Sequence, residues 1–530
     1  MPVQNPHVKA FLATLDDEAT TAALVTAAGD DTATVVAALR KAAESTASVP
    51  KNIGFHLHNL EMPNKPALVS PSDRDETAII VQRIARKNGA SKGLGGAYSF
   101  STAAWTRGTL ISHDRQRGVR AEPLRNLLPK AQTEGLWRVQ AGATIGDIYG
   151  AMDADGREPK QRPGFNDLTW VGASGTGAHG SGLGIGPLSA YTRAVEMISV
   201  DADRRVRRCR IEPARAPITD AKDWKPRNPD IDLIVDDDLF DAATVSFGAL
   251  GIVTGMVIES QPQSRLREDR TMHTWENMKT FLPTLHADPS VHSFQIWLNP
   301  YESKRKGQKD TWCVLSRYTR VPVTTQTRGI RGASIVLGGI PVIGELVTAI
   351  ANDFPERIPQ LVQAAIDGTL STDVVRPSFQ ALDFGAPNHL PVVACGFGVA
   401  IEVAVPAIER IVSVLRKRPM GVGWVTSTLG IRFAKGSTAH LGMQQGRDTC
   451  MIEVPILART NNARDTLDAL LRIAMDEFDA RPHWGQFNSM TGADARRLYP
   501  NFDKFVAAFD EFNPAGTFDN VLTDAIGLRD

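Results

Sequence analysis

The sequence has few cysteines and no pattern typical of a metal site. Its 530 residues include four cysteines, Cys209, Cys313, Cys395 and Cys450. They form no C-x-x-C pair, and no histidine stands at metal-ligand spacing from them. This scatter argues against a disulfide framework and a zinc site, because both need clustered ligands. We therefore expect free thiols, no metal and a reducing, cytoplasmic location.

The sequence also lacks net charge and a long unbroken apolar run. Lys plus Arg and Asp plus Glu each number 59, so no overall field favours nucleic acid or an anionic membrane. The arginine cluster of residues 204–210 is interpreted as a solvated strand edge or loop. The longest apolar tract, residues 333–350, is broken by glycines, Pro341 and Glu345, which argues against a membrane span. The N-terminus has no basic stretch before an apolar core, so no secretory signal is expected.

Glycine, by contrast, is concentrated in two stretches. Residues 171–186 read VGASGTGAHGSGLGIG, with seven glycines and His179 as the only ionisable side chain. A backbone this bare can lie directly against a large anionic ligand. The stretch contains a formal G-x-G-x-x-G, but no apolar strand leads into Gly175 and the residues after it are too rich in glycine and proline to open a helix. A Rossmann dinucleotide site is therefore not expected.

The second glycine-rich stretch, KGLGGAYSFS at residues 92–101, lies about eighty residues earlier. Segments with β-strand character flank both stretches. The two loops together suggest one elongated cofactor held from two sides. Further segments follow in a fixed order: PSDRDETAIIVQRIARKNGASKGLGGAYSFS, WRVQAGATIGDIYGAMDADG, VGASGTGAHGSG, FGALGIVTGMVIES, IEVAVP, RPHWG and FNPAGTFDN.

In the order and spacing of these segments the chain resembles the FAD-binding fold of the vanillyl-alcohol oxidase and p-cresol methylhydroxylase (PCMH) superfamily. Within it, the chain is most similar to the branch of aldonolactone, alditol and covalent-type cholesterol oxidases. The resemblance implies a two-domain α+β fold, with a PCMH-type FAD-binding domain and a substrate-binding cap of antiparallel sheet covered by helices. We expect a helical N-terminal preface at 1–65, the FAD domain at 66–262, the cap at 263–484 and a C-terminal segment at 485–530 that returns to the FAD domain.

Local patterns predict several elements. Ser72 is a plausible cap for a helix that stops at Gly89. Periodicity predicts strands at 137–140 and 194–200, two strands around a glycine turn within 245–259, and helices at 144–152, 408–417 and 464–478. Phenylalanines at helical spacing from Phe502 to Phe512 are expected to pack in the core.

The resemblance implies that backbone and small side chains hold FAD. The implied residues are Gly93, Gly95, Gly96, Ala97, Tyr98, Ser99, Gly164, Gly172, Ala173, Gly175, Thr176, Gly177, His179, Gly180, Ile252, Val253 and Asn520. Tyr98 stands where the family often has a histidine bonded to the flavin, and no cysteine lies between Arg157 and Trp170. Dissociable FAD is therefore favoured over a tyrosyl link. His113 is read as an ordinary loop or strand-edge histidine.

The substrate side departs from the family pattern. Relatives of this branch carry a Glu-x-Arg pair, whereas this chain has Arg432 with Gly430 in place of the acid. A family lysine is replaced by Gln486, a neutral donor. Ile452 and Val454 are expected to face the substrate, which predicts a drier pocket than a polyol needs. Glu402 and Glu453 are candidate bases only if their strands turn those faces inward.

Arg432, Gln486 and His179 are the candidate catalytic residues, although a loop-ordering role for His179 and a salt bridge for Arg432 stay open. Gly164, expected over the flavin, favours access of dioxygen. The hypothesis is an FAD-dependent oxidase that takes hydride from a CH–OH group of a moderately apolar small molecule and releases hydrogen peroxide. A dehydrogenase with a quinone or protein acceptor, and a flavin-binding protein without turnover, are the alternatives. Nucleic acid and stable membrane insertion are not expected as partners, and a homodimer is left open.

Overall fold

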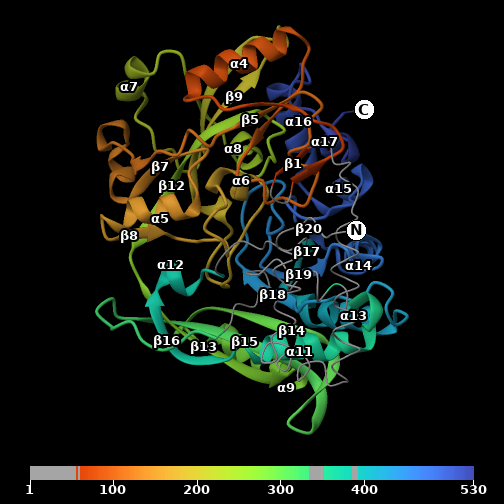
Figure 1. Cartoon of the computed structure of the whole chain (residues 1–530). Helices are drawn as coiled ribbons and strands as arrows, with labels where there is room; N and C mark the ends of the chain where they lie inside the picture. The colour runs from red at the N-terminus through yellow and green to blue at the C-terminus, as the bar shows by residue number, and fades with distance from the viewer. Residues whose placement is uncertain (1–54, 58–59, 333–347, 349–350, 385–391, 530) are drawn as a thin grey trace, which may run out of the picture.

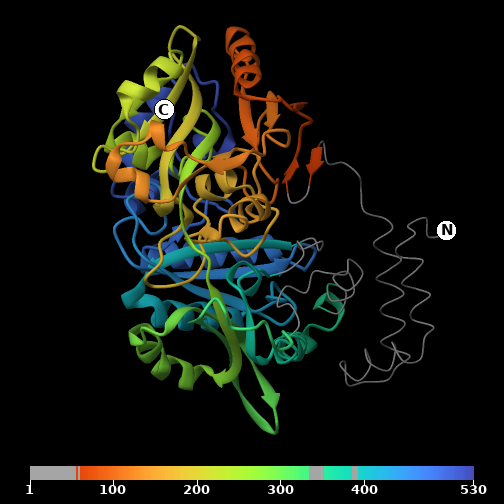
Figure 2. The same cartoon turned by 90° about the vertical axis from the view of Figure 1, so that its left-hand side faces the viewer.

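The structure is a computed structural model that describes residues 55–57, 60–332, 348, 351–384 and 392–529. The expected preface up to residue 54 and most of the apolar tract 333–350 lie outside the described residues. The chain forms two stacked bodies, one above the other (Figure 1). The first half of the chain builds the upper body, most of the second half builds the lower one, and the final segment runs back up to the first; Figure 2 gives the same division from the side.

Two sheets organise the upper body. The smaller sheet is parallel, in the order β3 (Ala67–Val69), β5 (Thr109–Ser112), β4 (Ser91–Leu94). The larger sheet has the order β11 (Asp232–Val235), β10 (Val206–Glu212), β9 (Thr192–Val200), β12 (Ile252–Pro262), β7 (Leu136–Gln140), β6 (Val119–Ala121), with β8 (Arg157–Pro159) paired to the end of β12. A two-stranded ribbon, β1 (Phe55–Leu57) and β2 (Leu60–Met62), precedes them. The helices of this body are α4 (Arg74–Arg86), α5 (Ile145–Asp153), α6 (Trp170–Gly175), α7 (Ala221–Trp224) and α8 (Asp237–Ala243).

One antiparallel sheet of eight strands organises the lower body. Its order is β16 (Ser371–Pro377), β13 (Arg265–Thr274), β15 (Gln308–Val321), β14 (Val291–Arg305), β18 (Leu429–Ala434), β19 (Thr449–Leu457), β17 (Val392–Ala400), β20 (Arg481–Pro482). The helices α9 (Trp275–Ala287), α11 (Ile358–Asp367), α13 (Ala404–Lys417) and α14 (Ala463–Phe478) pack against it, and α12 (Ser378–Ala381) contacts its edge (Figure 1). This confirms the expected α+β fold with a helix-covered antiparallel sheet; the domain bounds themselves stay predictions.

The C-terminal segment contacts the first glycine loop. It holds α15 (Gly492–Leu498), α16 (Phe502–Phe512) and α17 (Val521–Ala525). Asn520 Nδ2 donates to Thr102 O and Ala103 O at 3.1 and 2.8 Å, and Ser91 N donates to Thr517 O at 2.8 Å. The expected core role of the α16 phenylalanines is confirmed, since Phe502, Phe505, Phe509 and Phe512 are all buried. Asn520 therefore holds the loop from behind.

Helix caps follow the sequence closely, with one shift. The side chain of Asp73, not Ser72, caps α4 by accepting from Asp75 N and Glu76 N at 2.9 and 2.8 Å. Ser72 donates instead to the Glu76 carboxylate at 2.8 Å. Thr144 caps α5 in a capping box with Asp147, which confirms the helix expected at 144–152. A serine beside an aspartate offers two caps of nearly equal quality, and the sequence alone does not choose between them.

Two segments expected as strands are not strands. Phe247 and Gly248 have φ of 38° and 71°, so the chain before β12 turns instead of extending. The IEVAVP segment forms the 3₁₀ turn Ile401–Val403 and the start of α13. Both predictions were therefore wrong, because an apolar run of this length fits a buried turn or helix start as well as a strand.

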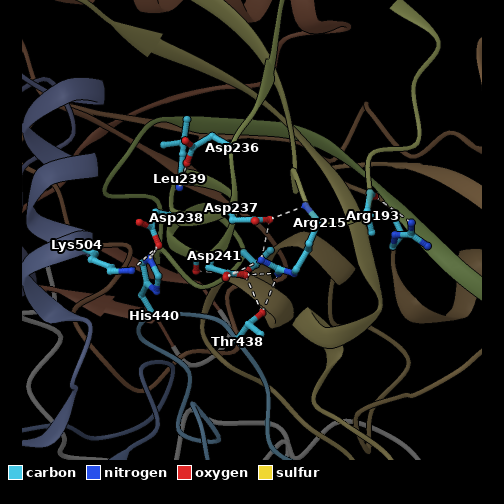
Figure 3. Close-up of polar contacts among 12 residues, drawn as sticks. Arg193, Arg215, Asp236, Asp237, Asp238, Leu239, Asp241, Thr438, His440 and Lys504 are labelled. Atoms are coloured by element: carbon cyan, nitrogen blue, oxygen red, sulfur yellow. Dashed lines mark hydrogen bonds and ion pairs between the residues drawn. The ribbon is translucent and has the colours of Figure 1, made fainter. Parts of the chain in front are cut away.

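Polar contacts join the two bodies around α8 (Figure 3). Arg215 donates to both oxygens of Asp241 at 2.6 and 2.9 Å and to Thr438 Oγ1 at 3.0 Å. Lys504 of α16 donates to Asp238 at 2.9 Å. Helix α8 is thus bonded to the lower body and to the C-terminal segment, which fixes the turn at 244–251 that follows it. None of the helices in the described part of the chain has the length and apolarity needed to cross a membrane.

Candidate active site

A cavity of about 390 Å³ lies where the upper and lower bodies meet. Its walls come from the two glycine loops, the turn at 244–251, strands β17 to β19 and the segment 483–486. Backbone contacts hold these pieces together: Phe247 N donates to Gly175 O at 2.8 Å, and the buried Lys92 Nζ donates to Gly248 O at 3.2 Å. A concave, mostly apolar cavity with few polar groups is typical of a cofactor site.

Most of the residues predicted to hold the cofactor line this cavity. They are Gly93, Gly95, Gly96, Ala97, Tyr98, Ser99, Gly164, Gly172, Ala173, Gly175, Thr176, His179 and Val253. Gly177, Gly180, Ile252 and Asn520 do not belong to the lining. A Cβ at Gly180 would lie 2.0 Å from Gln161 Oε1, so this glycine serves packing inside the protein.

The two glycine loops approach each other closely. A Cβ at Gly95 would lie 2.4 Å from Thr169 Oγ1, and a Cβ at Gly96 would lie 2.8 Å from Asp167 O. Thr169 itself caps α6 by accepting from Gly172 N. Gly175, at the end of α6, is different, since a Cβ there would meet nothing within 4 Å. The first loop is therefore glycine-rich so that the loops can touch, whereas Gly175 leaves open space.

Polar side chains gather at the end of the cavity formed by β18 and β19. Arg432 Nη2 donates to Glu453 Oε2 at 3.2 Å, and Gln486 Nε2 donates to Glu453 Oε1 at 2.9 Å. Among the described residues, Arg432 Nε and Gln486 Oε1 are buried without a hydrogen-bond partner. Arg432 also lies beside two aromatic rings that meet edge-on, with its guanidinium carbon 5.6 Å from the centroid of Trp297 and 5.0 Å from that of Phe384. The predicted catalytic residues Arg432 and Gln486 are thus brought together through Glu453.

The sequence did not predict the position of Glu453. Of the two residues expected to face the substrate, Ile452 lines the cavity and Val454 does not, whereas Glu453 between them lines it. Glu453 was recognised only as a conditional base, and β19 does turn this face inward. Its cross-strand neighbour on β18 is Gly430, the position where the family acid is missing. Finding this pair requires the strand register, which the sequence does not give.

Two histidines of the cavity are held in opposite tautomers. His179 Nδ1 lies 2.8 Å from Gly180 O, and because a carbonyl only accepts, Nδ1 carries the proton and Nε2 has the lone pair. His483 Nδ1 accepts from Gly485 N at 2.9 Å, so its proton is on Nε2. The ring centroids are 6.2 Å apart. Burial, with Arg432 nearby, lowers the pKa of His179 to about 3, and burial lowers the pKa of His483 to about 4. Both rings are neutral near pH 7.

His113 also lines the cavity, whereas the sequence predicts an ordinary loop or strand-edge histidine. It follows β5, whose neighbour β4 leads into the first glycine loop, and its Nε2 lies 3.6 Å from where a Gly93 Cβ would be. Within the described residues neither ring nitrogen has a hydrogen-bond partner, and burial lowers its pKa to about 4. The nearby Gln116 amide donates to Pro71 O, Asp73 O and Thr77 Oγ1 instead. The position of His113 could have been inferred, because β4 and β5 are adjacent parallel strands and such strands end at the same edge of a sheet.

Gly164 does not leave open space. A Cβ there would lie 2.2 Å from the Phe384 ring, and Phe384 N donates to Gly164 O at 2.8 Å. Phe384 also meets Trp297 and Phe165 edge-on, with centroids 5.6 and 5.8 Å away. The missing side chain at 164 thus accommodates an aromatic wall on the cap side.

The residues present fit an FAD. The cavity is bounded by backbone from two glycine loops, has room that a side chain at Gly175 would fill, and presents the unpartnered nitrogens of His113 inside its wall. No group of three or more His, Cys, Asp or Glu suited to a metal occurs in the described residues. Fold and cavity together are those expected of a two-domain, PCMH-type FAD-binding protein.

Comparison with known proteins shows what this chain is similar to. The family described as "ALO: D-arabinono-1,4-lactone oxidase" matches residues 269–526. The chain is 24% identical over 464 residues to L-gulono-1,4-lactone dehydrogenase of Mycobacterium tuberculosis, covering 86% of this chain and 95% of that protein. It is 24% identical over 391 residues to alditol oxidase of Streptomyces sp., covering 73% and 79%. It is 20% identical over 463 residues to L-gulonolactone oxidase of Bos taurus, covering 86% and 94%.

Among solved structures, cholesterol oxidase from B. sterolicum superposes with a TM-score of 0.69 at 12% identity, covering 90% of this chain and 98% of that one. These similarities support the aldonolactone and alditol oxidase branch of the PCMH-type superfamily that the sequence indicates. It is an FAD-dependent oxidoreductase, and the similar proteins are lactone and alditol oxidases or dehydrogenases.

Proposed function

We propose that this protein oxidises a ring CH–OH group of a compact, moderately apolar molecule such as a lactone. The observation that carries the proposal is the wall around Arg432. Trp297 and Phe384 pack beside the guanidinium, and the apolar Val392, Ala394 and Ile456 also line the cavity. Each buried hydroxyl left unpaired costs about 1–3 kcal/mol, so this wall disfavours an open-chain polyol. The relatives named for gulonolactone support a lactone.

Bound FAD supplies the hydride acceptor for the substrate C–H bond. The residues of the chain supply orientation and charge. The Arg432 guanidinium stabilises negative charge at the reacting end of the cavity. The Nε2 lone pair of His179 can accept a hydroxyl hydrogen bond, and the Nε2 proton of His483 can donate one. Gln486 is a neutral partner, and one N–H of its amide donates to Glu453.

The FAD is held without a covalent bond. Tyr98 occupies the cavity wall where the family often has the linking histidine. Burial raises the pKa of the Tyr98 phenol, which disfavours the phenolate that a tyrosyl link would need. Acid precipitation should therefore leave the flavin in the supernatant and the pellet colourless; a yellow pellet would contradict this assignment.

Dioxygen is the proposed electron acceptor, with hydrogen peroxide as product, as in the relatives named oxidases. A dehydrogenase is the second candidate, and one observation favours it: Phe384 fills the space beside Gly164 that the sequence reading assigned to dioxygen. Air reoxidation of substrate-reduced protein within seconds would support the oxidase. Reoxidation only by a quinone would support the dehydrogenase.

The experiment that tests the reaction is anaerobic flavin bleaching across lactones, alditols, sterols and phenols. Bleaching by a lactone and not by open-chain alditols is the expected result. Bleaching by alditols alone would overturn the substrate class, and no bleaching by any of the four would overturn the proposed reaction.

The four cysteines are unpaired and buried, which supports the cytoplasmic location. A homodimer stays a prediction, which light scattering would test.

A further inference from the structure

We propose that Glu453 supplies, from the neighbouring strand, the carboxylate that this chain lacks at Gly430, and that it acts as a positioning residue for Arg432 and Gln486. The inference rests on the proposed function, because it concerns how the same reacting end is held. It concerns a residue on β19, whereas the sequence pattern places the acid on β18.

The first support is the pattern of contacts. One carboxylate oxygen of Glu453 accepts from Arg432 and the other from Gln486, at 3.2 and 2.9 Å. Glu453 is the one carboxylate among the described residues that line the cavity, and its side chain is 30% exposed. Hydrogen bonds to a charged acceptor are stronger and more directional than neutral ones. A single carboxylate therefore sets the positions of both predicted catalytic side chains.

The second support is the fit between Gly430 and Glu453. The two residues are directly paired across β18 and β19. A Cβ at Gly430 would lie 3.4 Å from Trp297 Cζ3, 3.6 Å from Glu453 Cβ and 3.7 Å from Glu453 Oε2, so a side chain at 430 would lie in contact with the Glu453 carboxylate. Two acids directly opposite each other on these strands would repel, which favours a single acid at this pair.

The third support is the set of atoms left free. Because Arg432 uses Nη2 and Gln486 uses Nε2 for Glu453, the partnerless Arg432 Nε and Gln486 Oε1 remain. Both atoms are buried, one a donor and the other an acceptor, in side chains that line the same cavity. Without Glu453, neither the Arg432 guanidinium nor the Gln486 amide would keep the carboxylate that orients it.

The test uses four variants of the FAD-loaded protein: Glu453→Gln, Glu453→Ala, the double variant G430E/E453A and the control Glu477→Gln. The control breaks the exposed Arg410–Glu477 pair, whose contact is 2.7 Å, far from the cavity lining. Two quantities are measured: the limiting rate of anaerobic flavin reduction by the best substrate, and the affinity of the oxidised flavin for sulfite. Sulfite bonds to the flavin ring and places negative charge on it, so its affinity reports the local positive charge.

Glu453→Ala should lower the limiting reduction rate by about tenfold or more at unchanged FAD content, as expected when transition-state positioning is lost. Glu453→Gln should strengthen sulfite binding, because the charge of Arg432 is no longer balanced. G430E/E453A should recover most of the rate, since it returns the carboxylate to the adjacent strand. Glu477→Gln should change neither quantity.

Equal reduction rates in Glu453→Ala and wild type, or sulfite affinity unchanged in Glu453→Gln, would overturn the proposal. If G430E/E453A reduces its flavin as slowly as Glu453→Ala, an acid at position 430 does not replace the acid at position 453, and that part of the proposal fails. If no substrate reduces the wild-type flavin, the proposed reaction fails, and the sulfite measurements alone still decide the role of Glu453.

Discussion

Gly175 gives the sharpest test of where the cofactor lies. It ends α6, lines the cavity, and would place a Cβ in open space with nothing within 4 Å. Its φ is not positive, so a larger residue does not strain the backbone. Gly175→Leu should therefore fold normally and fill space that FAD needs.

The expected loss of FAD affinity follows from comparing the leucine side chain in the apoprotein with the same side chain against bound FAD. Replacing a helical glycine by leucine is favourable by roughly 0.5–1 kcal/mol in propensity alone, so the melting temperature of the apoprotein should not fall. Forcing the same side chain against a bound ligand costs roughly 1–3 kcal/mol, which corresponds to about 5- to 150-fold weaker FAD binding. The loss should appear in affinity and not in stability.

The assay is titration of apoprotein with FAD by fluorescence quenching, beside a thermal melt. The matched control is Gly150→Leu, since Gly150 lies within α5, is exposed, and also has nothing within 4 Å of a Cβ, but does not line the cavity. The control should bind FAD as wild type does. Wild-type affinity in Gly175→Leu would refute the placement of the cofactor against the second glycine loop.

Three further predictions concern the same cavity. Tyr98→His restores the family's linking residue, so part of the flavin should stay with acid-precipitated protein; complete release would show that residue 98 is not beside the reactive flavin carbon. Phe384→Ala clears the space beside Gly164 and should speed air reoxidation of reduced enzyme several-fold by stopped flow; an unchanged rate would mean that this wall does not control oxygen access. Burial holds the pKa of His113 at about 4, below that of the unfolded chain near 6.5. The unfolded state therefore binds more protons, and stability falls as pH drops from about 6.5 to 4; His113→Gln should remove up to ~1.4 kcal/mol per pH unit of that slope in urea melts, and an identical slope would show that His113 is charged when folded.

Local features made much of the fold predictable. The caps at Asp73 and Thr144 were recognisable within one residue, because short polar side chains before an apolar periodic run are typical of helix starts. The turn at Phe247 and Gly248 was not recognisable, since its apolar residues also suit a strand. There, the backbone contact of Phe247 with Gly175 decides the conformation, and that contact is long-range.

The candidate site also has residues that the sequence predicts and residues that it does not. The glycine loops could be predicted because their composition is itself the signal, and most of their predicted residues line the cavity. Glu453 and Phe384 could not, because each matters through a partner distant in sequence, Gly430 for one and Gly164 for the other. A glycine in a sequence shows that a side chain is missing, but not what occupies the space.

The most direct measurement for the whole account is the flavin content of the purified protein. The account predicts a yellow protein with one FAD per chain, released into the supernatant by acid and taken up again by the apoprotein. A colourless protein that binds no added FAD would contradict it.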